Sequence, residues 1–261
     1  MRGFTLVEII VSLTILTLIS GAIYSTFVLH QKSFQLAQER EEIMQNGRVV
    51  LERLSRELRQ AKELITLLPD TPDIQGFPPP SEISFQDGHL PAILEEVNPQ
   101  GATSNTILLS LDSSEIDDYY KGAFIKIISG QGAGEIKKII EYNGATKVAN
   151  LSEPWQETPT SGSLYKIDTS YYYISYYLEG NNLKRSISVY YFSGDSNSFV
   201  SQRSIPPSGQ TLEEEILEDE IIGEYISDIT FWGEPLINIT LSLIKGENSL
   251  NLQTKVFGRN L

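Results

Sequence analysis

The stretch Gly3-Phe4-Thr5-Leu6-Val7-Glu8-Ile9-Ile10-Val11 opens an apolar run that continues to Leu29. From Ile9 to Leu29 the sequence contains no charged side chain. At the rise of an α-helix, this segment is about 30 Å long, which is the thickness of the hydrocarbon core of a bilayer. The run therefore predicts one membrane-spanning helix.

The residues at the start of this run distinguish it from an ordinary secretory signal. A signal peptide has its small-residue cleavage site after the apolar segment, whereas Gly3 precedes it, directly after Arg2. Glu8 lies inside the segment, where an unpaired carboxylate costs about 2 to 3 kcal/mol on insertion scales. Glu8 therefore needs a partner, unless the segment is an uncleaved signal anchor whose Glu8 stays near the lipid headgroups.

Gly3, followed by Phe4-Thr5-Leu6-Val7-Glu8 and about twenty apolar residues, resembles the leader and N-terminal helix of the type IV pilin and type II secretion pseudopilin superfamily. The resemblance implies that a prepilin peptidase cleaves after Gly3 and that the new N-terminus, Phe4, is N-methylated. It also implies that Glu8 neutralises the Phe4 ammonium of a neighbouring subunit in a filament. Such pairing is physically reasonable, because two paired charges in an apolar core cost less than either charge alone.

Composition limits the remaining functions. The formal net charge of −14 at pH 7 argues against nonspecific binding to nucleic acid or to anionic lipid headgroups. Cysteine is absent, which excludes disulfides, thiolate nucleophiles and cysteine-ligated metals. Of the two histidines, only His89 could serve a Ser-His-Asp arrangement, and no nucleophile motif surrounds it. We therefore expect no catalytic residue, no cofactor and no metal ligand, and a protein that is not an enzyme.

The segment from residue 30 to residue 68 keeps helical periodicity after the span. Apolar or small residues recur every three or four positions along it, which is typical of an amphipathic helix with one buried face. These residues are Met44, Gly47, Leu51, Leu54, Leu58, Ala61, Ile65 and Leu68. Pro69 is expected to end the helix. The buried face is assigned to a globular head, and an independent coiled coil is the alternative.

The rest of the chain predicts antiparallel β structure. Alternating or β-branched segments bounded by turn residues indicate strands. They are 82–86, 106–111, 123–129, 135–142, 147–151, 164–167, a tyrosine-rich hairpin over 171–191 and a C-terminal hairpin over 236–256. The glycine cluster 130–134 is interpreted as a hairpin rather than a phosphate-binding loop, because the residues after it form a strand pattern instead of a helix start. Packing accounts for the tyrosines, and an aromatic sugar-binding platform is the alternative.

Two acidic clusters are candidate cation sites by composition. Residues 112–118 contain four carboxylates, but their spacing matches no calcium loop, so a solvated acidic turn is favoured over a calcium site. Residues 213–220 are expected to form an exposed charged loop or a short helix.

Two further resemblances concern the β region. Residues 120–135 and 142–147, together with Trp155, resemble a small β module of phage-associated and surface-exposed bacterial proteins, which implies an insertion. The ending, residues 254–260, looks like the closing strand of larger minor pilins and of J-type minor pseudopilins.

The predicted fold is therefore α+β: a long N-terminal transmembrane and amphipathic helix packed on an antiparallel, pilin-like β head, with an inserted small all-β module. The predicted domain boundaries follow from these segments. They are a leader 1–3, a transmembrane helix 4–29, an amphipathic continuation 30–68, a β head 69–102 and 169–261, and an inserted β module 103–168.

The predicted function is that of a minor pilin or minor pseudopilin, a structural subunit of a membrane-assembled filament in type II secretion or type IV pilus biogenesis. The alternative is a membrane-anchored surface β protein that acts in adhesion or ligand binding. The expected partners are the prepilin peptidase and N-methyltransferase, other major and minor pilins or pseudopilins, the membrane assembly platform and, before assembly, the lipid bilayer. No direct nucleic-acid partner is expected. The protein would cross the inner membrane once, with a cytoplasmic N-terminus and an extracytoplasmic head, before entering the filament.

Overall fold

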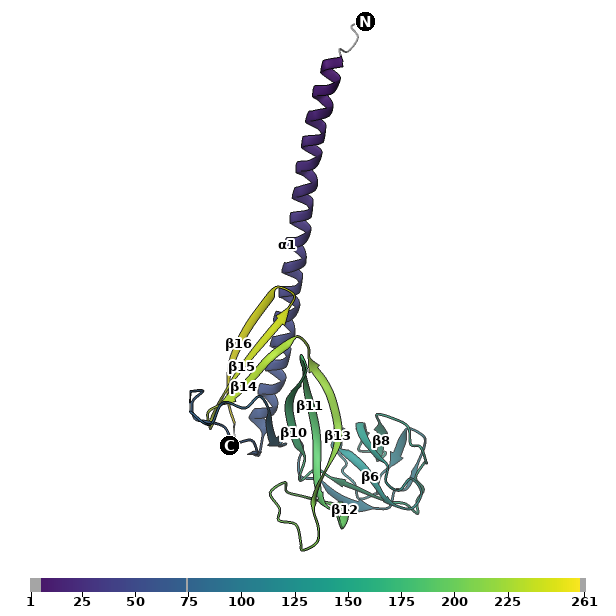
Figure 1. Ribbon diagram of the computed structural model, residues 1–261. Helices are drawn as coiled ribbons and strands as arrows, with labels where there is room; N and C mark the ends of the chain where they lie inside the picture. Colours follow the sequence, from purple (N-terminus) through teal and green to yellow (C-terminus); the bar gives the residue numbers. More distant parts are fainter. Residues whose placement is uncertain (1–5, 74, 259–261) are drawn as a thin grey trace.

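The computed structural model describes residues 6–73 and 75–258. A single helix, α1 (Leu6–Gln60), extends away from a head made of β-strands, and only its C-terminal part packs against that head (Figure 1). The strands form three antiparallel sheets. The predicted α+β class, with a long N-terminal helix packed on antiparallel sheets, is confirmed.

The head-facing part of α1 buries a stripe of apolar side chains. Ile43, Val50, Leu54 and Leu58 are each at most 1% exposed. Their spacing places them on one face of the helix, in contact with the core of the head. The predicted globular head, rather than an independent coiled coil, therefore covers the amphipathic segment.

The helix ends at Gln60, so the predicted end at residue 68 is wrong. Beyond Gln60 the backbone turns into β1 (Glu63–Leu64), which pairs with β2 (Ile83–Gln86). The Lys62 amide donates to the Gln86 carbonyl at 3.0 Å, and the side chain of Leu64 joins the same core as the helix. Sheet pairing and burial of Leu64 thus replace two further helical turns, and Pro69 is not the residue that ends the helix.

A six-stranded sheet forms the first layer under the helix. Its order is β1-β2-β10-β11-β12, and β13 pairs with the other side of β11. The later strands are β10 (Tyr173–Glu179), β11 (Asn182–Phe192), β12 (Asp195–Val200) and β13 (Leu212–Gly223). The predicted tyrosine-rich hairpin is confirmed, because β10 and β11 pair up to Glu179 and Asn182.

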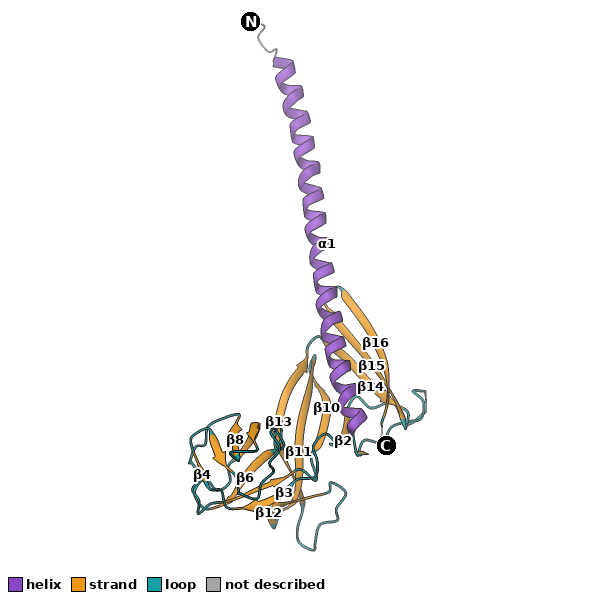
Figure 2. Cartoon of the chain, turned by 180° about the vertical axis from the view of Figure 1, so that it is seen from behind, coloured by secondary structure: helices purple, strands orange, loops and turns teal. Residues whose placement is uncertain are grey.

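A three-stranded sheet completes the surface on which α1 lies. It consists of β14 (Ile226–Trp232), β15 (Leu236–Lys245) and β16 (Asn248–Phe257), in that order. These strands run beside the lower half of the helix in both views (Figures 1 and 2). Leu241 and Leu243 are fully buried in the core shared with the helix. The predicted C-terminal hairpin is confirmed by the β15–β16 pairing.

A seven-stranded sheet with its own core lies to the side of the helix axis (Figure 1). Its order is β3-β9-β6-β7-β8-β5-β4. The strands are β3 (Leu94–Val97), β4 (Gly101–Ala102), β5 (Thr106–Leu108), β6 (Phe124–Ser129), β7 (Ile136–Asn143), β8 (Val148–Leu151) and β9 (Leu164–Asp168). β3 and β4 belong to this sheet although residues 69–102 were predicted to belong to the head, because β3 pairs with β9 and buries Ile93 beside it.

The glycine cluster connects β6 to β7, and a strand follows it as predicted. Gly130, Gly132 and Gly134 have φ values of 86°, 80° and 92°, a region that side chains disfavour. A Cβ on Gly130 would lie 2.7 Å from the backbone of Ser163. The glycines therefore allow a tight, closely packed connection between two strands.

The acidic run 213–220 forms most of strand β13, so the predicted loop or short helix is wrong. Cations on strands of the seven-stranded sheet pair with its half-buried carboxylates. Lys138 Nζ lies 2.7 Å from Glu218 Oε1, and Lys126 Nζ lies 3.5 Å from Glu215 Oε2. These partners come from β6 and β7, which are distant in sequence and invisible to a local pattern.

A buried ion pair joins the helix to the sheet. Arg185 on β11 is 8% exposed in its side chain, and its Nε donates to both carboxylate oxygens of Glu57 at 3.1 and 2.9 Å. The Tyr176 hydroxyl donates to the same carboxylate at 2.8 Å. Because both charges lie largely away from water, loss of Arg185 would leave Glu57 with only its longer contact to Arg53, at 3.5 Å.

We predict that Arg185→Met lowers the free energy of unfolding by about 3 kcal/mol, because Glu57 then stays largely buried with only the longer contact to Arg53. Chemical unfolding of the detergent-solubilised full-length protein, followed by tryptophan fluorescence, measures this change. The matched control is Arg203→Met, since Arg203 and Glu63 form an ion pair whose side chains are 56% and 39% exposed. It should cost less than about 1 kcal/mol. Equal losses in the two variants would contradict the assignment.

Candidate assembly site

The N-terminal half of α1 presents an apolar surface that nothing in the described chain covers. Leu18, Ile23 and Phe27 are 70%, 65% and 62% exposed. The most apolar window of this helix has a mean hydropathy of 1.8, and none of it is buried within the protein. Figure 2 shows this part of the helix standing clear of all strands. By length and composition it is the one described helix able to cross a membrane.

Three threonine hydroxyls of this half bond to the helix itself. The hydroxyls of Thr14 and Thr26 donate to the carbonyls of Ile10 and Ala22, four residues earlier, at 2.8 and 2.9 Å. Thr17 donates to the Thr14 carbonyl at 2.8 Å. In a medium without water each polar group must be satisfied internally, and these hydroxyls meet that requirement.

Glu8 lies in the first turn of α1 and is exposed. A carboxylate is favoured there, because the helix dipole and unpaired amides place positive charge at a helix N-terminus. Gly3 and Phe4, the predicted processing residues, lie outside the described residues. Of the predicted processing and assembly residues, the structure therefore places only Glu8, in the first turn of the exposed apolar helix.

Residues 1–24 match the family model of the prokaryotic N-terminal methylation motif. The chain thus carries the signal of type IV pilins and pseudopilins. No curated protein and no solved structure matches the chain.

The prepilin signal has direct consequences for this chain. It implies processing by a prepilin peptidase. Together with the apolar half of α1, it indicates anchoring in the inner membrane. With α1 packed on antiparallel sheets, the fold is pilin-like.

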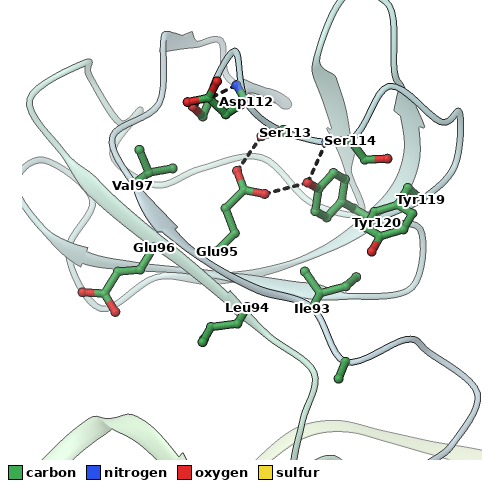
Figure 3. A pocket seen from close by; sticks show the side chains of 12 residues that line it. Ile93, Leu94, Glu95, Glu96, Val97, Asp112, Ser113, Ser114, Tyr119 and Tyr120 are labelled. Carbon is green, nitrogen blue, oxygen red and sulfur yellow. Dashed lines mark hydrogen bonds between the residues drawn. The ribbon is translucent and has the colours of Figure 1, made fainter.

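A second candidate site is an open hollow of about 620 Å³ on the seven-stranded sheet. Figure 3 shows the carboxylate of Glu95, from β3, at its centre. Ser113 Oγ donates to Glu95 Oε1 at 2.5 Å, and the Tyr120 hydroxyl donates to Oε2 at 2.6 Å. The Tyr165 hydroxyl, from β9, also donates to Oε1. The neighbouring Glu96 also lines the hollow, but its carboxylate is directed away from that of Glu95 (Figure 3).

The tyrosines around Glu95 remain neutral hydrogen-bond donors over a wide pH range. Burial, reinforced by the charges of Glu95 and Asp117, raises the pKa of Tyr142 to about 12. Burial and the hydrogen bond to Glu95 raise the pKa of Tyr120 and Tyr165 further. Hydroxyls surrounding one carboxylate form strong, charge-assisted bonds, so this group fastens β3 to the loop before β6 and to β9.

The other residues selected from the sequence have structural contacts. His89 Nδ1 lies 3.1 Å from Gln60 Oε1, and its amide donates to Asp87 at 2.8 Å. In the acidic turn, Asp117 accepts the Gly144 amide at 2.9 Å, and Asp118 pairs with Lys121 at 2.9 Å. Among the described residues, no group of three histidine, aspartate or glutamate side chains is close enough to hold a metal ion.

Sequence analysis missed Glu95 and Arg185. Glu95 belongs to a proline-rich connector in which only one strand was predicted, and its three hydroxyl donors come from distant positions. The available signal was local: in Ile93-Leu94-Glu95-Glu96-Val97 a carboxylate shares strand parity with Ile93 and Val97, which both pack in the core of the seven-stranded sheet.

We predict that Glu95→Gln lowers the free energy of unfolding by about 2 kcal/mol, because an amide cannot accept three hydroxyl hydrogen bonds. Glu96→Gln is the matched control and should change stability by less than about 0.5 kcal/mol, since Glu96 is exposed. Thermal and chemical unfolding, followed by fluorescence of the buried Trp155, tests both variants. An unchanged stability of Glu95→Gln would show that the carboxylate does not fasten these strands.

Proposed function

We propose that this protein is a minor pilin or minor pseudopilin: a structural subunit of a membrane-assembled filament in type II secretion or type IV pilus biogenesis. The observation that carries the proposal is the division of α1 into two halves. One half is apolar and exposed, and the other is held in the core of a β head. A single helix with these two surfaces is suited to lie in a bilayer before assembly and then to pack against identical or related helices in a filament.

The proposed assembly chemistry involves Gly3, Phe4 and Glu8. Cleavage after Gly3 creates an N-terminal ammonium on Phe4 at the end of the apolar helix. In a filament core, the Glu8 carboxylate of a neighbouring subunit would neutralise that ammonium. Burial of both charges is tolerable only as a pair, so the pairing would fix the axial register of neighbouring helices.

The shape of the head supports a minor rather than a major subunit. The seven-stranded sheet lies to the side of the helix axis and enlarges the head on one side (Figure 1). A subunit repeated along a filament must fit neighbours all round it, whereas a subunit near the tip has fewer neighbours. The asymmetric head is therefore better suited to the tip.

We predict that the mature N-terminal peptide begins at methylated Phe4. Mass spectrometry of the membrane-extracted protein tests this, with the protein produced in its own cell and in a cell lacking the prepilin peptidase. The peptide should still carry Met1-Arg2-Gly3 when the peptidase is absent. An unprocessed peptide in both cells would overturn the filament-subunit proposal.

We predict that Glu8→Ala abolishes incorporation into the filament but leaves membrane insertion intact. Removal of an intramembrane carboxylate favours insertion by about 2 to 3 kcal/mol, whereas the Phe4 ammonium loses its partner. Fractionation of membranes and sheared filaments, followed by immunodetection, separates the two effects. The control is Glu41→Ala, which removes an exposed carboxylate from the same helix near the head. Normal incorporation of Glu8→Ala would contradict the assigned role.

A further inference from the structure

Strand β16 has one unpaired edge. It is the last strand of the three-stranded sheet, and within residues 6–73 and 75–258 it pairs only with β15. It is also long, running from Asn248 to Phe257. An exposed strand edge presents a row of backbone donors and acceptors, and extended peptides bind proteins by adding to such edges.

A groove of about 520 Å³ lies between this strand and α1. Leu252, Gln253 and Thr254 line it from β16, and the helix faces it with residues between Arg48 and Arg59. Leu51 and Ser55, which also line it, are 9% and 8% exposed and are its least exposed lining residues. The groove therefore combines a strand edge with a partly apolar floor.

Three exposed arginines, Arg48, Arg56 and Arg59, line the helical side of the groove. None of them makes an ion pair with the described part of the chain, whereas Arg53, Arg185 and Arg203 each pair with a carboxylate. Glu52 is the single carboxylate among the lining residues, which leaves a surplus of two positive charges. In a chain of net charge −14, such a surplus beside an unpaired strand edge suits an acidic partner.

We propose that this groove binds an extended acidic segment of a partner protein, which adds to β16 as a fourth strand and directs carboxylates at the arginines. The spacing agrees with this geometry. Arg48 and Arg56 are eight residues apart on the helix, which is about 12 Å along its axis. Residues i and i+4 of a strand lie on the same face and are about 13 Å apart. β16 runs alongside this part of α1 (Figure 1), so an added strand would run along the arginines.

A second copy of this chain is a poorer occupant than a different protein. Its own acidic strand, β13, already commits its inward carboxylates within each molecule: Glu215 pairs with Lys126, Glu218 with Lys138, and Glu220 with Arg53. The proposal does not depend on filament assembly, because the groove lies on the head and not on the exposed apolar half of α1.

The test uses the purified full-length protein in detergent and fluorescent peptides of about ten residues. The first peptide alternates Glu and Val. The second has the same charge but carries proline at the Val positions, so it cannot pair as a strand. Fluorescence anisotropy should show binding of the first peptide that weakens with salt, and binding of the second at least about tenfold weaker.

The double variant Arg48→Glu/Arg56→Glu should reduce binding of the Glu-Val peptide at least about tenfold. The matched control is Lys32→Glu/Arg40→Glu, which reverses two exposed charges of the same helix outside the groove and should bind normally. All four positions are exposed, so the variants should fold, and circular dichroism checks this.

Four results would overturn the proposal. Equal binding of the two peptides would show that the groove attracts acidic peptides by charge alone, without strand addition. Normal binding by the arginine variant, or no binding at all, would remove the groove as a site. Concentration-dependent self-association that the arginine variant abolishes would identify the occupant as a second copy rather than an acidic partner.

Discussion

The structure depends on one constraint: the two halves of a single continuous helix must lie in different surroundings. From Ile10 to Leu29 the helix is largely apolar and exposed, whereas Ile43 to Leu58 present a face that is buried in the head. Burial of one large apolar side chain is worth about 1.5 to 3 kcal/mol, so the thirteen exposed ones between Leu6 and Leu29 outweigh the 5 to 15 kcal/mol that stabilise a typical domain. The apolar half of α1, and not the head, therefore decides where the protein resides, in lipid or in a core of other helices.

In the head, the main constraint is instead the placement of charged side chains. Its acidic strand β13 meets cations from three directions: Arg53 on α1, Arg185 on β11, and Lys126 and Lys138 on the seven-stranded sheet. Phe124, on β6, also packs in the core of the head. The strand that looks least suited to a sheet by composition is thus the place where helix, head and seven-stranded sheet are tied together.

Local sequence patterns predicted the elements that form between residues close together in the sequence. The spacing of apolar residues predicted the helix. The alternation of side chains between turn residues predicted the two hairpins, whose turns lie around Glu179–Asn182 and Lys245–Asn248. The end of α1 and the nature of β13 could not be predicted in this way, because both depend on partners distant in sequence. Ala61 continues the helical stripe and is buried as that stripe requires, yet the backbone after it pairs with β2 instead. The site around Glu95 could not be predicted for the same reason, because its hydroxyl donors are distant in sequence.

The topology explains how the head can carry a seven-stranded sheet without being reorganised by it. β2 and β10 are adjacent and antiparallel, with Gln86 opposite Tyr173, although more than eighty residues separate them in sequence. The chain leaves the six-stranded sheet after β2 and returns beside the same strand, as it would after a simple hairpin turn. Because both ends are held about 5 Å apart by the ladder, the cost of closing even a long excursion rises only slowly with its length. We infer that the seven-stranded sheet occupies the position of a loop between β2 and β10, fastened to the head through Phe124 and the ion pairs of β13.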